Sequence, residues 1–246
     1  VALPQIQADL GFSAAGLSWV PNAFALAFGG LLLLGGRLGD MIGQVRAFKI
    51  GLAIFTFASL LGGLADSAAL LIGARVLQGV GAALAGPSVL ALIAVTARDD
   101  TDRQRGLSMF IAVSAIGSSL GLLLGGVLTE LLSWRWSLLI NVPVGIVVIT
   151  VIGRLVPETR SQRARLDLGG AVTATLGCVA LVYAFISAAE NGWGRLPTIL
   201  SIAIGLLLLG AFFIIERAHK TPLLDLSLLA DRTRLAGLGV MGMVVG

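Results

Sequence analysis

The feature that most constrains this chain is a set of seven stretches that contain no Asp, Glu, Lys or Arg. They lie at residues 10–36, 50–65, 76–97, 106–129, 136–153, 168–189 and 196–215. A helix that spans the hydrocarbon core of a bilayer needs about 20 mostly apolar residues, and most of these stretches are close to that length. The sequence therefore predicts seven complete spans, the third of which we extend back across Arg75 to about Ala68.

The two ends of the chain continue this pattern. Residues 1–6 are expected to be the end of an earlier helix, and Leu235 begins a further apolar run that reaches Gly246. The chain also begins at Val1 rather than at a methionine. We therefore expect it to be part of a longer protein.

Composition excludes an ordinary soluble domain, because only 12% of the 246 residues are charged and 57% are hydrophobic. In typical globular chains about a quarter of the residues are charged. Backbone polar groups inside a bilayer must bond to one another, which leaves only helix bundles and closed barrels. Barrel strands alternate over about 10 residues, whereas these stretches are continuously apolar. The predicted fold class is an all-α, polytopic membrane protein.

The basic residues are divided unevenly among the loops between the predicted spans. Taken alternately, one set of loops holds fourteen of the 17 Lys and Arg residues, the other holds two, and Arg75 lies within a span. Because basic loops remain in the cytoplasm, the first set is expected on the cytoplasmic side of the plasma (inner) membrane. This set lies near residues 37–49, 98–105, 154–167 and 217–234. The outer set lies near Asp9, Asp66, Glu130 and Glu190.

Arg75 is the first candidate functional residue. An arginine within an apolar span costs about 2.5–3.5 kcal/mol on insertion scales, so it normally faces a cavity or a partner. Gln78 follows one turn later on the same helix face, and Gly79 and Gly81 come next. This pattern predicts a polar cavity lining beside a close helix contact. The alternative is an anchoring arginine that reaches toward the membrane surface.

A charged, glycine-rich segment at residues 36–46 separates the first two complete spans. Gly36 and Gly43 permit a tight turn and close packing. Asp40 is expected to accept hydrogen bonds from a helix N-terminus or to pair with Arg46. The segment is either a gate that differs between two conformations or a static turn that fixes topology.

Glycines recur every four residues within the stretch at 106–129, and prolines lie in or near several spans. Gly117, Gly121 and Gly125 share one helix face, and small residues let membrane helices approach closely. We therefore expect a close helix contact on this face. Proline removes a backbone donor, which predicts bends near Pro21, Pro87 and Pro143.

These motifs together resemble the major facilitator superfamily. The segment at 36–46 is similar to the signature loop between helices two and three, with Met41 and Gln44 where basic residues are usual. Residues 75–83 resemble the fourth-helix motif of proton-coupled members, in which the arginine is associated with proton transfer. The glycines resemble the antiporter motif, although Leu122 replaces its usual proline. The members of this motif are Gly117, Gly121, Gly125 and Gly126.

The later part of the chain is similar to the drug:proton antiporters with fourteen helices. The start of helix six in that branch resembles Trp134, Arg135, Trp136, Asn141 and Pro143. The two spans that follow Asp167 match the two inserted helices that mark the branch. The resemblance implies a major facilitator type helix bundle in three parts. They are the N-terminal repeat from the end of helix one to helix six (1–155), the two inserted helices (156–218), and a cytoplasmic loop with the start of the second repeat (219–246).

The function implied by this resemblance is secondary active transport, in which amphipathic small molecules or drugs leave the cell in exchange for protons. Its partners would be a small-molecule substrate, protons and the lipid bilayer, and the proton gradient would supply energy in place of a cofactor. The complete protein would work as a monomer. The net charge of +4 is spread over several turns, so nucleic acid is not an expected partner.

Three other interpretations remain open. Leu122 favours a uniporter or symporter of sugars, peptides or lipids, and a non-transporting scaffold or sensor would leave Arg75 without a role. No HExxH, CxxC or Walker-type motif occurs, so a zinc enzyme or an ATP-driven pump is not expected. Neither a metal site nor another enzyme site is expected, because the spans hold no paired carboxylates and no Ser-His pair.

Overall fold

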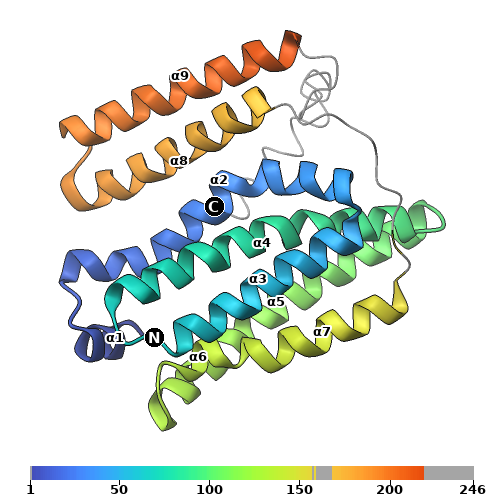
Figure 1. Cartoon of the computed structure of the whole chain (residues 1–246), viewed down its shortest axis with the longest axis horizontal. Helices are drawn as coiled ribbons and strands as arrows, with labels where there is room; N and C mark the ends of the chain where they lie inside the picture. Colours follow the sequence, from blue (N-terminus) through green and yellow to red (C-terminus); the bar gives the residue numbers. More distant parts are fainter. Residues whose placement is uncertain (1, 157, 159–167, 219–246) are drawn as a thin grey trace.

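The structure, a computed structural model, describes residues 2–156, 158 and 168–218. Within these ranges the chain forms nine helices and no strand (Figure 1). They are α1 (Leu3–Leu10), α2 (Ala14–Ile42), α3 (Gln44–Gly63), α4 (Ala68–Thr96), α5 (Asp100–Leu131), α6 (Trp136–Leu139), α7 (Asn141–Leu155), α8 (Leu168–Asn191) and α9 (Leu196–Ala218). Seven segments have the length and apolar composition to cross a membrane, with α6 and α7 counted as one. The predicted all-α class and the seven spans are confirmed.

Several predicted features lie outside the described residues. They are the basic loop positions within 159–167 and 219–234, Asp167 at the start of the inserted helices, and the apolar run that begins at Leu235.

The helices extend beyond the uncharged stretches, and the first predicted turn is wrong in its extent. Helix α2 continues to Ile42, because Arg37 and Asp40 lie three residues apart on one helix face and pair at 3.9 Å. Gly43 alone makes the turn to α3, with a φ of 95° that favours glycine. The charged residues predicted as a loop at 100–105 likewise belong to α5. Asp99 caps that helix, since its carboxylate accepts a hydrogen bond from the Asp102 N–H at 2.8 Å.

Helix α4 packs tightly between α2 and α3, and its glycines make both contacts possible. A Cβ atom on Gly79 would lie 2.6 Å from the carbonyl oxygen of Phe24 in α2. A Cβ atom on Gly81 would lie 2.5 Å from the carbonyl oxygen of Gly51 in α3 and 2.6 Å from the nitrogen of Phe55. These approaches leave no room for a side chain on either glycine, so α2, α3 and α4 form one packed region.

Helices α5 to α7 form a more open region. Only Thr129 is buried among the 32 residues of α5, and only Gly145 is buried in α7. Gly145 packs against the Thr56 side chain of α3. The sixth span is divided into α6 and α7 at Ile140. Pro143 has no N–H to bond to the carbonyl of Leu139, which accounts for the interruption.

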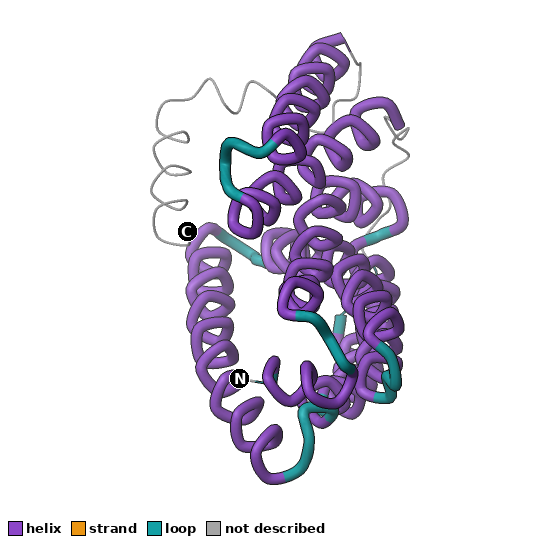
Figure 2. Tube along the Cα trace, turned by 90° about the vertical axis from the view of Figure 1, so that its left-hand side faces the viewer, coloured by secondary structure: helices purple, strands orange, loops and turns teal. Residues whose placement is uncertain are grey.

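Helices α8 and α9 form a hairpin that lies as a further layer on α2, as Figure 1 and Figure 2 both show. Gly30 of α2 packs against Val179 of α8, and the rings of Trp19 and Tyr183 lie 6.1 Å apart. Next to Trp19, the Ser18 hydroxyl donates to the Glu190 carboxylate at 2.5 Å. The hairpin is thus attached to the bundle along α2.

The helix ends fall into two groups at opposite ends of the bundle (Figure 1). One end holds the turn at Gly43, the connection between α4 and α5, the end of α7, the start of α8 and the end of α9. The other end holds α1, the connection between α3 and α4, the segment before α6, and the turn between α8 and α9.

Candidate functional site

The candidate site is centred on Arg75, which the packed region holds at the contact between α2 and α4. Its Nε donates to the carbonyl oxygen of Val20 at 3.0 Å, and its Nη1 donates to Gln78 Oε1 at 2.6 Å. The guanidinium carbon lies 4.7 Å from the centre of the Phe24 ring, within range of a cation–π interaction. Arg75 is therefore held by the protein rather than directed at lipid.

The polar network continues from α4 into α3. The Nε2 of Gln78 donates to Ser59 Oγ at 2.7 Å, and the Ser59 hydroxyl donates to the carbonyl oxygen of Phe55 at 2.8 Å. Gln78 is 1% exposed and Ser59 is fully buried. A buried polar group needs a partner, and each group in this chain of bonds has one. Sequence reasoning did not identify Ser59, although a serine within an apolar span was the available signal.

Arg75 lines a cavity of about 250 Å³ at the end of the packed region that lies next to α1. Its other lining residues include Ile6, Leu71, Trp134 and Ser137. Within the described part of the chain, no carboxylate pairs with Arg75, and its hydrogen-bond acceptors are a carbonyl and an amide. An arginine with only neutral acceptors keeps its capacity to attract an anionic group, such as a carboxylate that carries or releases a proton.

A second group of residues joins α1 to the segment before α6. Trp134 Nε1 and Arg135 Nη1 both donate to Asp9 Oδ2, at 2.9 and 3.0 Å. Arg135 also donates through Nη2 to the carbonyl oxygen of Ala65 at 3.1 Å. The hydrogen bond from Trp134 and, next, that from Arg135 lower the pKa of Asp9 below its ordinary value, because both bonds favour the carboxylate.

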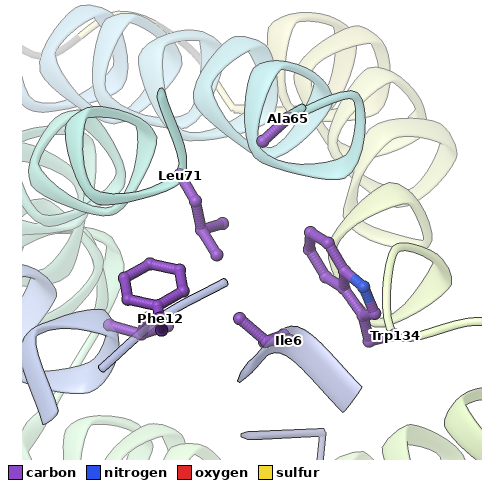
Figure 3. Packing of buried hydrophobic residues seen from close by; sticks show 6 residues of the cluster. Ile6, Phe12, Ala65, Leu71 and Trp134 are labelled. Carbon is purple, nitrogen blue, oxygen red and sulfur yellow. The ribbon is translucent and has the colours of Figure 1, made fainter. Parts of the chain in front are cut away.

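Trp134 itself is buried, with 1% of its surface exposed. Figure 3 shows its ring directed into an apolar cluster that includes Ile6 of α1. The cluster consists of Ile6, Phe12, Val20, Ala65, Leu71 and Trp134. Trp134 is therefore a core residue with a polar partner rather than an interfacial anchor.

The remaining residues of the predicted helix-six motif are divided among other places. Trp136 begins α6 and is 48% exposed. Asn141 begins α7 and is half-buried, and Pro143, the third residue of that helix, is exposed. The structure thus brings Trp134 and Arg135 together with Asp9, while the other three residues lie along the interrupted span.

The predicted gate residues lie around the turn at Gly43 in two separate ion pairs. Asp40 pairs with Arg37 at 3.9 Å and accepts a hydrogen bond from Gln44 Nε2 at 2.9 Å. Arg46 pairs with Glu158 at 3.4 Å. The predicted pair of Asp40 with Arg46 is therefore wrong, because each residue has a nearer partner of opposite charge.

A larger cavity of about 610 Å³ lies beside this turn, between α2, α4 and α5. Its walls are mostly apolar, with Phe28, Pro87 and Phe110 among the lining residues, and Gly36 and Asp40 also line it. Gly36 faces Pro87, since a Cβ atom on this glycine would lie 3.6 Å from the proline Cβ.

The glycine face of α5 does not make the expected contact within the described residues. Cβ atoms on Gly117, Gly121 and Gly125 would each find no other atom within 4 Å. Gly126 is half-buried, and Leu122 is 69% exposed. The prediction of close packing on this face is wrong for the described part of the chain, because no described helix reaches it.

Seven membrane-length segments among the described residues, with a hydrogen-bonded arginine in one of them beside a cavity, define a polytopic membrane protein with a polar site in its helices. Within the described residues, no group of three His, Cys, Asp or Glu side chains could hold a metal ion.

The chain belongs to the major facilitator superfamily, because the profile of that family matches residues 1–246. It is 48% identical over 235 residues to the uncharacterized MFS-type transporter EfpA of Mycobacterium tuberculosis, covering 96% of this chain and 44% of EfpA. It is 47% identical to the cephamycin export protein CmcT of Amycolatopsis lactamdurans, covering 91% of this chain and 47% of CmcT.

A third relative is the puromycin resistance protein pur8 of Streptomyces alboniger, which is 44% identical over 99% of this chain and 48% of its own length. The chain thus spans about half the length of the curated relatives it matches. Members of this family are multi-pass membrane transporters of small molecules rather than enzymes.

Proposed function

We propose that the complete protein is a secondary active transporter that exports amphipathic small molecules or drugs in exchange for protons. The observation that carries the proposal is Arg75, which is held between two helices beside a cavity and has only neutral acceptors. Such an arginine can bind a carboxylate in one step of a cycle and favour its deprotonation. The names of the relatives, which include an export protein and antibiotic resistance proteins, support export of drug-like molecules.

The rest of the molecule is assigned by the same proposal. Residues 1–155 form the N-terminal repeat, residues 156–218 contain the two inserted helices, and residues 219–246 lead into the second repeat. The end of the bundle with the turn at Gly43 faces the cytoplasm of the plasma membrane, because most of the described basic residues, such as Arg46, Arg98 and Arg154, lie at or near that end. The complete protein works as a monomer.

Two regions would move during the transport cycle. The ion pairs beside Gly43 form a cytoplasmic gate, since Asp40 and Arg46 are both partly accessible and have separate partners. The unoccupied glycine face of α5 packs against the second repeat and lets the two repeats rock, because three glycines on one face leave a smooth surface.

The test uses the full-length transporter in vesicles with an imposed pH gradient and a fluorescent cationic dye as substrate. We expect dye efflux driven by proton influx, and loss of that efflux in Arg75→Gln. Arg98→Gln is the matched control, because Arg98 is an exposed arginine in the connection after α4. Its efflux is expected to equal that of the wild type.

Other results would reject defined parts of the proposal. Proton influx that accompanies dye influx would select a symporter. Wild-type efflux by Arg75→Gln would remove Arg75 from the mechanism, and a complete lack of dye movement in the wild type would reject drug export.

A further inference from the structure

We propose that Ser59 of α3 is a positioning residue for Arg75, which it controls through the side-chain amide of Gln78. The inference rests on the proposed role of Arg75 in transport. Ser59 does not touch Arg75 in the hydrogen-bond network, since Gln78 lies between them. Its effect depends on the direction of each hydrogen bond in the chain from Phe55 to Arg75.

The direction of this chain of bonds is set by the single proton of the Ser59 hydroxyl. Ser59 Oγ lies 2.8 Å from the Phe55 carbonyl oxygen, which can only accept, so the hydroxyl proton is used there. The oxygen of Ser59 can then only accept from Gln78, which lies 2.7 Å away. The NH₂ group of Gln78 must therefore point toward Ser59.

The orientation of Gln78 in turn decides what Arg75 meets. With its NH₂ group on Ser59, the amide presents Oε1 to Arg75 Nη1 at 2.6 Å. A reversed amide would place two donors against each other, because arginine has no acceptor. Gln78 is buried, so water cannot compensate for such a mismatch. Ser59 thus ensures that Gln78 attracts the guanidinium instead of repelling it.

The two helices that carry this chain of bonds cannot separate or slide without losing close packing. Gly81 of α4 packs against the backbone of Gly51 and Phe55 in α3, one turn from the Ser59–Gln78 bond. With Nε on Val20 and Nη1 on Gln78, the guanidinium is fixed at two nitrogens. Within the described residues Nη2 makes no hydrogen bond, so it is the nitrogen left for an incoming anionic group.

Ser88 provides a matched control within the same protein. It is also fully buried, and its hydroxyl donates to the Leu84 carbonyl at 3.0 Å, four residues earlier in the helix. Unlike Ser59, it accepts no side-chain hydrogen bond in the described part of the chain. Ser59→Ala and Ser88→Ala therefore remove the same kind of local bond, but only Ser59→Ala releases Gln78.

The first experiment measures two quantities, the rate of proton-driven dye efflux and the ratio of dye molecules to protons. The vesicles contain equal amounts of folded, full-length transporter. We expect Ser59→Ala to lower proton-coupled efflux about tenfold, the scale of one misdirected hydrogen bond to a charged group. Ser88→Ala should change it by less than about twofold. Ser59→Thr keeps the hydroxyl and is expected to retain the wild-type ratio of dye to protons.

Repeating Ser59→Ala in a protein that also carries a substitution of Gln78 separates the orientation of the Gln78 amide from the packing around Ser59. In Gln78→Met the side chain has a similar length and carries no amide, so Arg75 stays next to neutral groups and no amide orientation remains for Ser59 to set. Ser59→Ala is expected to cause no further loss of the remaining efflux in Gln78→Met. If Ser59→Ala lowers efflux by the same factor with Gln78 and with Gln78→Met, or if it behaves like Ser88→Ala, the positioning role is wrong.

A stability measurement tests the inference without transport. Thermal unfolding of the detergent-solubilised full-length protein is compared for Ser59→Ala, Arg75→Gln and their double variant. The same comparison is made for Ser88→Ala, Arg75→Gln and their double variant. Coupled residues give non-additive changes, whereas independent ones add. We expect coupling between Ser59 and Arg75 and additivity between Ser88 and Arg75. Additivity in both pairs would overturn the inference, whereas coupling without dye efflux would reject only the proposed transport function.

Discussion

Helices α4 and α5 are consecutive in the chain, have 29 and 32 residues, and each carries a glycine-rich face, yet their surroundings are opposite. Gly79 and Gly81 of α4 lie against the backbones of two neighbouring helices, whereas Gly117, Gly121 and Gly125 of α5 face open space. A small-residue pattern therefore predicts that a helix can be approached closely. Whether it is approached depends on a partner that the pattern itself does not identify.

The open region is nevertheless joined to the rest of the molecule at the end that lies next to α1. Trp134 lies just after α5 and inserts into the apolar cluster around Ile6, and Gln5 of α1 donates to the carbonyl oxygen of Thr129 at 3.0 Å. These contacts hold the C-terminal end of α5 against its neighbours, while most of the helix remains exposed.

The largest expected effect comes from breaking this join. Trp134→Ala should lower the free energy of unfolding by about 3–5 kcal/mol, because a large buried aromatic side chain is removed and Asp9 loses a donor. Trp136→Ala should cost less than about 1 kcal/mol, since that ring is half exposed. Chemical unfolding of the full-length protein in detergent measures both. Equal losses would mean that the two regions are not joined through Trp134.

A second pair of variants tests the contrast between the two glycine faces directly. Gly81→Val should destabilise the protein by about 2 kcal/mol or more, because the new side chain meets the backbone of α3. Gly121→Val should leave the amount of folded protein unchanged but reduce transport, because this face is proposed to move against the second repeat. Folded yield is measured by size-exclusion chromatography and transport by dye efflux. Normal efflux in Gly121→Val would show that the α5 face has no moving partner.

The smallest expected effect concerns the carboxylate that holds the join. Because the pKa of Asp9 is lowered in the folded protein, its contribution to stability is present above the ordinary carboxyl pKa and is lost as the pH falls through the lowered value. The melting temperature of the wild type should therefore fall between about pH 5 and about pH 3. Asp9→Asn should reduce this pH dependence slightly. An unchanged pH dependence in Asp9→Asn would show that Asp9 does not contribute to the stability of the contact between α1 and the segment before α6.

The number and class of the helices could be predicted because they depend on local composition. Seven uncharged stretches correspond to seven membrane-length segments, since a bilayer requires a long apolar segment whatever its neighbours are. Helix ends were predicted less well. Charged residues such as Asp40 and Asp100 were assigned to loops, but a helix that extends past the hydrocarbon core can carry them in its last or first turn.

The partners of the functional residues could not be predicted, because they come from distant parts of the chain. Arg75 was identified from its cost in a bilayer, but its contact with Val20 joins residues 55 positions apart. Asp9 and Arg135 are separated by 126 positions. Ser59 is one of several serines within apolar spans, and what distinguishes it is its hydrogen bond to Gln78, which depends on the approach of α4 to α3. The glycines of α5 show the converse, a clear pattern without a described partner.

The turn at Gly43 also limits how the length of such a chain can vary. A single residue joins α2 to α3, and each residue added to or removed from a helix rotates its downstream part by about 100°. A one-residue insertion at this point would turn Ser59 away from α4 or strain the turn between α2 and α3. An insertion in the connection at 97–99 would leave α2, α3 and α4 in register. Among related sequences, gaps are therefore expected at 97–99 and not at residue 43.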